Sequence, residues 1–131
     1  MEKKSGDTRP EAILHYLPFS KDQMNNYQRI VEKAKSLMEA NVSGAINLPG
    51  ISKQIGISIS RFNEIFKAYT SMTPYQYYMR LKIKKAADLL EQKSASVKEV
   101  AYSLGFEDQY CFSRFFKKKT GVAPSVWRKL I

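Results

Sequence analysis

The sequence has little of the chemistry on which most enzymes and metalloproteins depend. It contains one cysteine, Cys111, and one histidine, His15. A single cysteine forms neither an intramolecular disulfide nor a cysteine-based metal cluster, and a single histidine removes most histidine-dependent mechanisms and zinc sites. No glycine-rich phosphate loop is present, and no nucleophile has a histidine partner close in the sequence. We therefore predict that the chain is not an enzyme and that it needs no cofactor and no metal.

Long apolar runs and structure-breaking residues are scarce as well. No stretch approaches the roughly 20 apolar residues of a spanning helix, and residues 1–9 precede no apolar segment of the signal-peptide kind. A cytoplasmic protein without a membrane partner is therefore expected. Six glycines and five prolines are too few for a fibrous polymer. Pro10 and Pro18 fall in the first twenty residues, which we interpret as a flexible tail or the end of a linker.

Acidic residues are in deficit. The chain has 12 of them against 22 lysines and arginines, which gives a formal net charge of +10. A surplus of that size on a small protein favours a polyanionic partner, with nucleic acid first and an anionic membrane second. The 44% of hydrophobic residues is typical of a globular chain, and 131 residues suffice for one domain or two small ones.

An internal repeat is the most informative feature that is present. The segment ISKQIGISISRFNEIFKAYTSMTPYQYY, starting at Ile51, aligns with VAYSLGFEDQYCFSRFFKKKTGVAPSVW, starting at Val100. The offset changes from 49 to 50 residues between the two halves of the alignment, which predicts one extra residue in the second turn. Two copies are too few for a solenoid, so we interpret them as a duplicated small module. The matched pairs are Phe62 with Phe112, Ile65 with Phe115, Phe66 with Phe116, Lys67 with Lys117, Thr70 with Thr120 and Pro74 with Pro124.

Each copy predicts a helix-turn-helix, because a short helix, a glycine-containing turn and a second helix with one apolar face follow in order. We predict an all-α fold of seven helices, in which a long bridging helix joins two helix-turn-helix modules. The expected helices cover 21–40, 48–55, 59–69 and 74–92, then one opened by a capping box at Ser96 and Glu99, one that follows Asp108, and a short one that begins at Ala123 and Pro124.

The predicted boundaries place a tail at 1–20 and a single domain at 21–131. Within this domain the first module covers about 21–73, the bridging helix about 74–92 and the second module about 96–131. A helix of that length spans roughly 28 Å. Successive major grooves on one face of B-DNA are about 34 Å apart. One chain could therefore place the second helix of each module in adjacent grooves.

The polar faces of these two helices provide the candidate site. Arginine pairs with guanine, asparagine or glutamine with adenine, and a carboxylate accepts from cytosine, whereas lysine suits phosphates. The second helix of the first module, which carries Glu64, is expected to discriminate between sequences more than it attracts DNA. Base contacts are predicted for Ser60, Arg61, Asn63, Glu64, Gln109, Tyr110, Ser113 and Arg114, and phosphate contacts for Lys53, Lys67, Lys117, Lys118, Lys119 and Arg128.

From about Asn25 to Arg128 the sequence resembles the AraC/XylS family of bacterial transcription regulators. The resemblance rests on SRFNEIFK, on KIKKAADLL and above all on VKEVAYSLGFEDQYCFSRFFKKKTGVAPSVWR. It implies seven helices with two helix-turn-helix modules, base contacts from the second helix of each, and phosphate contacts at Trp127 and Arg128. The chain departs from the family pattern at Glu64, where arginine is usual, at Ser71, where glycine is usual, and at Lys82, where arginine is usual.

The leading hypothesis is a sequence-specific DNA-binding transcriptional regulator acting on double-stranded DNA. The alternatives are a nonspecific architectural nucleic-acid-binding protein and a helical module that binds an acidic protein. RNA polymerase and a sensor or dimerisation domain outside this chain are further partners that the resemblance leaves open. It also leaves open whether the chain is complete or the C-terminal part of a larger protein.

Overall fold

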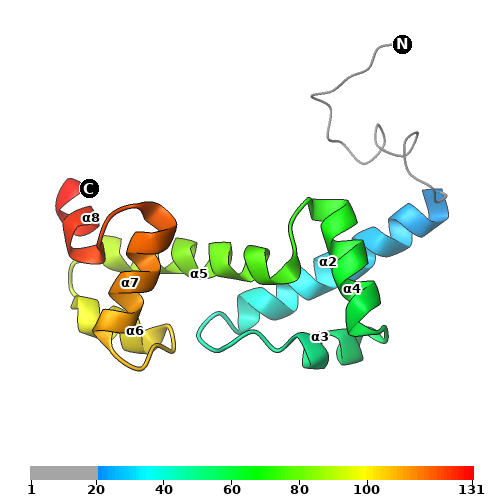
Figure 1. Cartoon of the computed structure of the whole chain (residues 1–131), viewed down its shortest axis with the longest axis horizontal. Helices are drawn as coiled ribbons and strands as arrows, with labels where there is room; N and C mark the ends of the chain where they lie inside the picture. Colours follow the sequence, from blue (N-terminus) through cyan, green and yellow to red (C-terminus); the bar gives the residue numbers. More distant parts are fainter. Residues whose placement is uncertain (1–20) are drawn as a thin grey trace, which may run out of the picture. The chain divides into compact units, whose positions relative to one another are not determined.

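The computed structural model describes residues 21–131, and this part of the chain contains seven helices and no strand (Figure 1). The all-α prediction is thus confirmed, while the predicted tail at 1–20 lies outside the described residues. The helices are α2 (Lys21–Ala40), α3 (Leu48–Ile55), α4 (Ile59–Thr70), α5 (Pro74–Glu91), α6 (Val97–Ser103), α7 (Gln109–Thr120) and α8 (Pro124–Leu130).

The helices form two compact packing units. The first takes α2 up to Ser36 together with Leu48–Pro74, and the second takes Leu37–Asn47 together with Tyr75–Ile131. The second unit therefore includes the bridging helix α5. It also includes the segment that follows α2, which the sequence had grouped with the first module.

The core of the first unit comes from helical periodicity. In α2, Met24, Tyr27, Val31 and Ala34 are buried at spacings of three or four residues, so they share one face. The rings of Phe62 and Phe66 in α4 meet edge to face, with centroids 5.7 Å apart. Ile51, Ile65 and Pro74 of this unit are buried as well.

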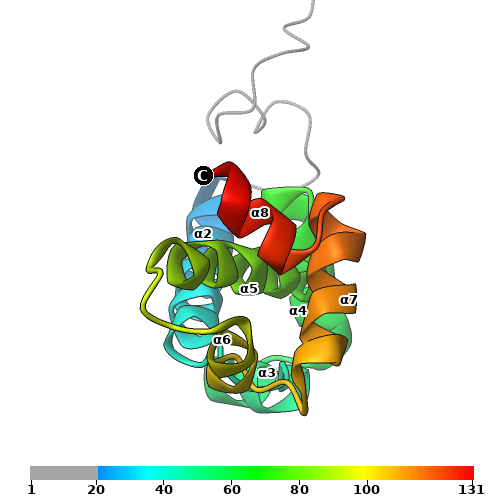
Figure 2. The same cartoon turned by 90° about the vertical axis from the view of Figure 1, so that its left-hand side faces the viewer.

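The second unit has a core of its own, formed where α6, α7 and α8 surround one end of α5 (Figure 2). Phe116 lies at its centre, with its ring centroid 5.8 Å from that of Phe112 and 6.1 Å from that of Trp127. The buried residues of this cluster are Ala86, Leu90, Val100, Ala101, Leu104, Phe112 and Phe116.

Two side chains of α5 hold the segment that follows α2. The hydroxyl of Tyr78 lies within hydrogen-bonding distance of the carbonyls of Asn41, Val42 and Gly44, and the ammonium of Lys82 donates to Gly44 O at 2.8 Å. Carbonyls beyond a helix end need such partners. These contacts explain why residues 37–47 pack with the second unit.

Gly105 in the turn of the second module lies against the same segment. A Cβ at this position would stand 1.8 Å from the carbonyl oxygen of Ser43, and the backbone has a positive φ of 86°. Only glycine satisfies both conditions. In the first module, Gly56 also has a positive φ, 94°, but a Cβ there would meet nothing within 4 Å.

The two modules end their second helices in the same way. Thr70 Oγ1 contacts the carbonyls of Phe66 and Met72 at 2.7 and 3.0 Å, and Thr120 Oγ1 contacts the equivalent carbonyls at 2.8 and 3.0 Å. The next residue adopts the left-handed conformation in both cases, at Ser71 (φ 67°) and at Gly121 (φ 92°). The repeat seen in the sequence is therefore a repeat of capping geometry.

Candidate nucleic-acid interface

Helix α4 presents a polar face on the first module. Its N-terminus is capped by Ser58, whose side chain accepts from the backbone N–H of Arg61 at 3.1 Å. The apolar residues Phe62, Ile65 and Phe66 are buried. The four residues predicted to contact bases lie outside this core: Ser60, Arg61 and Glu64 are exposed, and Asn63 is half-buried.

Helix α7 has the same arrangement in the second module. Its N-cap is Asp108, whose carboxylate accepts from the backbone N–H of Cys111 at 2.8 Å, and this hydrogen bond lowers the pKa of Asp108. The turn between Gly105 and Asp108 is one residue longer than that between Gly56 and Ser58, as the sequence predicts. The predicted base-contacting residues Tyr110 and Arg114 are exposed, whereas Gln109 and Ser113 are half-buried.

The burial of the apolar side of α7 differs in one detail from the sequence pattern. Phe112 and Phe116 are fully buried, but Phe115 is only half-buried. Its ring lies 5.3 Å from that of Phe106, and it borders a cavity of about 300 Å³. The cavity is lined by Ala45, Ile46, Tyr75, Tyr78, Met79, Lys82, Phe106 and Phe115.

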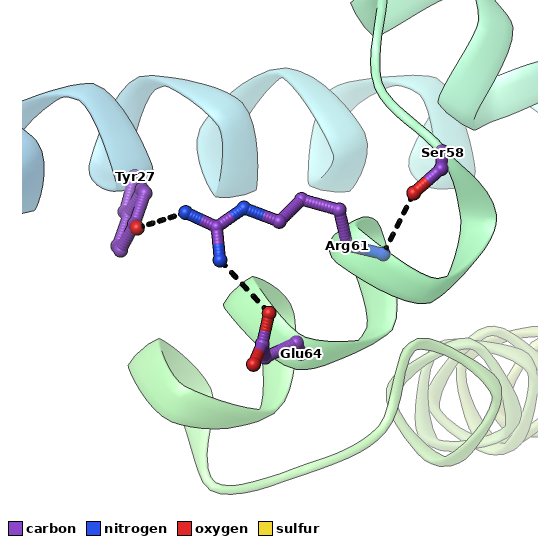
Figure 3. Close-up of polar contacts among 4 residues, drawn as sticks. All are labelled: Tyr27, Ser58, Arg61 and Glu64. Carbon is purple, nitrogen blue, oxygen red and sulfur yellow. Dashed lines mark hydrogen bonds and ion pairs between the residues drawn. The ribbon is translucent and has the colours of Figure 1, made fainter.

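The guanidinium of Arg61 is engaged within the first module (Figure 3). Its Nη1 donates to Glu64 Oε1 at 2.8 Å, and its Nη2 donates to the hydroxyl of Tyr27 from α2. The guanidinium carbon also lies 5.3 Å from the centroid of the Tyr27 ring. The hydrogen bond to Glu64 is the main reason why the pKa of Arg61 is raised. Two residues of the predicted site are thus brought together by an ion pair.

Arg114 occupies a different environment in the second module. Its contact along the helix is a hydrogen bond from Nη2 to the sulfur of Cys111 at 3.5 Å. Sulfur is a weak acceptor, so this contact restrains the guanidinium far less than a carboxylate does. The repeat aligns Arg114 with Glu64 and Cys111 with Arg61. The same pair of positions is in contact in both modules, with different chemistry.

The predicted phosphate-binding lysines lie at helix ends. Lys53 is in the last turn of α3, Lys67 in the last turn of α4, and Lys117, Lys118 and Lys119 in the last turn of α7. Cations at this end of a helix interact favourably with the helix dipole. All five side chains are exposed.

Trp127 and Arg128 make contacts inside the second unit. The Trp127 ring packs edge to face on Phe116, and Arg128 Nε donates to Leu90 O at 2.9 Å near the end of α5. Both residues are half-buried. Arg128 Nη2 is buried and has no hydrogen-bond partner within the described residues. The structure thus gives both residues an anchoring role, and their phosphate contacts stay a prediction.

Sequence reasoning missed two features of these surfaces. Tyr27 carried an apolar signal in the helical pattern of α2, but nothing in the sequence pairs it with Arg61, 34 residues away. Lys82 looks like a solvated residue of a basic helix, yet it is only 7% exposed. Its ammonium lies 5.3 Å from the ring centroids of both Tyr78 and Phe106, and burial lowers its pKa. The signal in the sequence was that Lys82 stands at a position where the family usually has arginine.

Across residues 21–131, no helix is long and apolar enough to cross a membrane. In the same part of the chain, no three histidine, cysteine, aspartate or glutamate side chains are grouped so that they could hold a metal ion.

Comparison with known proteins gives a consistent result. A family model described as a helix-turn-helix domain matches residues 51–130. The Msm operon regulatory protein of Streptococcus mutans is 27% identical over 122 residues, which are 92% of this chain and 44% of that protein. The MmsAB operon regulatory protein of Pseudomonas aeruginosa is 33% identical over 94 residues, which are 72% of this chain and 31% of that protein. The chain thus spans less than half the length of these relatives.

A solved structure extends the similarity to three dimensions. A transcriptional regulator from Chromobacterium violaceum, described as an AraC-type DNA-binding domain-containing protein, superposes with a TM-score of 0.72 at 28% identity. The superposition covers 80% of this chain and 94% of that one.

Proposed function

The chain belongs to the AraC-type helix-turn-helix family of DNA-binding transcription regulators, and from this premise we propose that it binds specific double-stranded DNA sequences and thereby controls transcription. In this proposal α4 and α7 enter adjacent major grooves. The observation that carries the proposal is the duplication: two helices of the same length, 12 residues, end in the same threonine cap and expose polar side chains opposite buried phenylalanines.

The charge distribution supports this proposal. The net charge of +10 provides the sequence-independent attraction to phosphates. Exposed arginine and glutamate side chains, with half-buried Asn63 and Gln109 beside them, provide groups that distinguish base edges in the major groove. Helix α5 has 18 residues and so spans about 27 Å, which is suited to two sites roughly one helical turn apart. We place the protein accordingly with the DNA in the cytoplasm.

Selection of bound sites from a random oligonucleotide pool tests the proposal. We expect an enriched sequence with two half-sites about one helical turn apart, and an affinity that falls steeply as salt increases. The control is a shuffled duplex of the same composition, measured at physiological salt. Equal affinities for the selected and the shuffled duplex would contradict sequence-specific recognition.

Two matched variants on α7 test the assignment of the residues. Arg114→Ala should cost about 1–3 kcal/mol of binding free energy and should relax the preference at one base pair. Lys118→Ala should weaken binding to all sequences alike. It should also reduce the slope of log affinity against log salt concentration by about one. Uniform losses in both variants would contradict the role of Arg114 in base recognition.

A further inference from the structure

The guanidinium of Arg61 has little freedom to recognise a base. Recognition of guanine by arginine uses two parallel N–H groups of the planar guanidinium at once. In the first module Nη1 already donates to Glu64 and Nη2 to Tyr27 (Figure 3). Each of these two nitrogens therefore already has one of its N–H groups engaged within the module.

The side chain of Tyr27 restricts the position of the Arg61 guanidinium. Its side chain is only 7% exposed, and it belongs to the buried face of α2. The ring also lies against the guanidinium, with 5.3 Å between the arginine carbon and the ring centroid. A buried aromatic side chain has few alternative rotamers, so its hydroxyl is a fixed point for Arg61. Arg61 is consequently tied to the scaffold rather than only to its neighbour on the helix.

Glu64 is the more accessible member of the pair. Its side chain is 68% exposed, compared with 47% for Arg61. One carboxylate oxygen, Oε1, accepts from Arg61, and no partner of the other oxygen is found in the described part of the chain. An ionised carboxylate only accepts hydrogen bonds. Among the bases in the major groove, cytosine offers its N4 amino group as the matching donor for a glutamate.

We propose that Glu64 recognises a cytosine through its free carboxylate oxygen and that Arg61 and Tyr27 are positioning residues for that carboxylate. This inference rests on the proposed DNA-binding function and deepens it. Arg61 balances the charge of Glu64, so the pair as a whole adds no net charge next to the phosphates. The Arg61–Glu64 pair then discriminates between bases without adding net electrostatic attraction to the phosphates.

The comparison with the second module sharpens this assignment. Arg114, at the equivalent place, forms no hydrogen bond or ion pair with a carboxylate in the described part of the chain, although its charge acts on nearby Asp108, and it suits guanine. The two modules should therefore differ in the base that they prefer at equivalent positions, with cytosine facing α4 and guanine facing α7.

The experiment measures the affinity of the full chain for the selected duplex and for duplexes with each single base replaced. Glu64→Gln keeps the shape of the side chain but removes the charge, and glutamine pairs with adenine. This variant should lose the cytosine preference, which we expect to be about five- to 150-fold in the wild type. It should also bind shuffled DNA as tightly as the wild type or more tightly, while the base preference facing α7 stays unchanged.

Tyr27→Phe and Arg61→Lys test the positioning role. Tyr27→Phe removes only the hydroxyl, and it should reduce the cytosine preference by about two- to tenfold, in keeping with the loss of one hydrogen bond. Its base preference facing α7 should stay unchanged, which a general loss of the fold would not predict. Arg61→Lys retains the charge without the planar fork, so it should reduce the cytosine preference in the same way.

Two outcomes would overturn the inference. A cytosine preference that persists in Glu64→Gln would show that the Glu64 carboxylate does not recognise the base. A guanine preference at the position facing α4 that disappears in Arg61→Lys would show that Arg61 leaves its partners on DNA and recognises the base itself. A wild-type protein that recognises a half-site through α7 but has no cytosine preference facing α4 would contradict the inference and leave the proposed function standing. Equal binding of all duplexes would contradict both.

Discussion

Residue 64 in the first module and residue 114 in the second occupy equivalent places on equivalent helices, yet one is a glutamate and the other an arginine. The residues around them that face the core are alike: Phe62 corresponds to Phe112 and Phe66 to Phe116, and all four are buried. Packing constrains the buried positions because interiors tolerate little change of volume. The exposed positions carry no such constraint, so the two modules can keep one framework while their recognition surfaces diverge.

The largest expected effect distinguishes the turns of the two modules. Gly105→Ala would place a Cβ 1.8 Å from the backbone of Ser43 in addition to straining a positive φ. We expect a loss of about 3 kcal/mol of unfolding free energy or more, since backbone atoms cannot move aside cheaply. Gly56→Ala is the matched control, and it should cost only the left-handed strain of about 1–2 kcal/mol. Urea denaturation measures both, and equal losses would mean that Ser43 yields easily.

An exchange of charge at position 64 tests whether the difference between the modules lies in the side chain or in its surroundings. Glu64→Arg removes the partner of Arg61 and adds a cation where the second module has Arg114. Affinity for shuffled DNA should rise. The slope of log affinity against log salt concentration should become steeper by about one. Gel-shift titrations at several salt concentrations measure this. An unchanged salt dependence would indicate that residue 64 lies away from the DNA.

The ends of the second helices allow a reciprocal exchange. Ser71 and Gly121 share the left-handed conformation, in which a serine is strained and a glycine is not. Ser71→Gly should stabilise the chain by about 0.5 kcal/mol, and Gly121→Ser should destabilise it by about 1 kcal/mol. Thermal unfolding of the two variants and of the double exchange gives both values. Effects of the same sign would show that the two caps are not equivalent.

The smallest effect concerns pH, because one module caps its second helix with Ser58 and the other with Asp108. The hydrogen bond from Cys111 lowers the pKa of Asp108 below its ordinary 3.8. A lowered pKa stabilises the folded state above the unfolded value, and this contribution disappears as the pH falls through the folded value. Asp108→Asn, which still caps, should flatten this acid dependence. Unfolding curves measured between neutral pH and about pH 2 test this prediction. In the first module, Ser58→Asp should make the unfolding free energy depend on acid pH in the same way.

Much of the fold could be predicted because its signals are local. The capping box at Ser96 and Glu99 is present, with hydrogen bonds of 3.0 and 2.8 Å in the two directions. Pro74 and Pro124 open the helix that follows the second helix of each module, and the predicted helix ends agree with the structure to within a residue or two. Such signals involve groups that are three or four residues apart, so the sequence displays them directly.

The details of the candidate site were less predictable. The spacing of Arg61 and Glu64 permits an ion pair on one helix, but the third member, Tyr27, comes from another helix. The same holds for Arg128, which a basic composition assigns to phosphate and which donates to Leu90 at the end of α5. Long polar side chains reach partners that only the packing of helices brings near, and no local rule states which partner is chosen.

The sequence by itself determined the seven helices, the duplicated module and the class of partner, because periodicity, caps and net charge are properties of neighbouring residues and of composition. The tertiary structure decided which cations are free to meet DNA. It engaged Arg61 with Tyr27 and Glu64, buried Lys82 against the carbonyl of Gly44, and placed Gly105 against Ser43. These contacts join residues that are distant in the chain, so they exist only after the helices have packed.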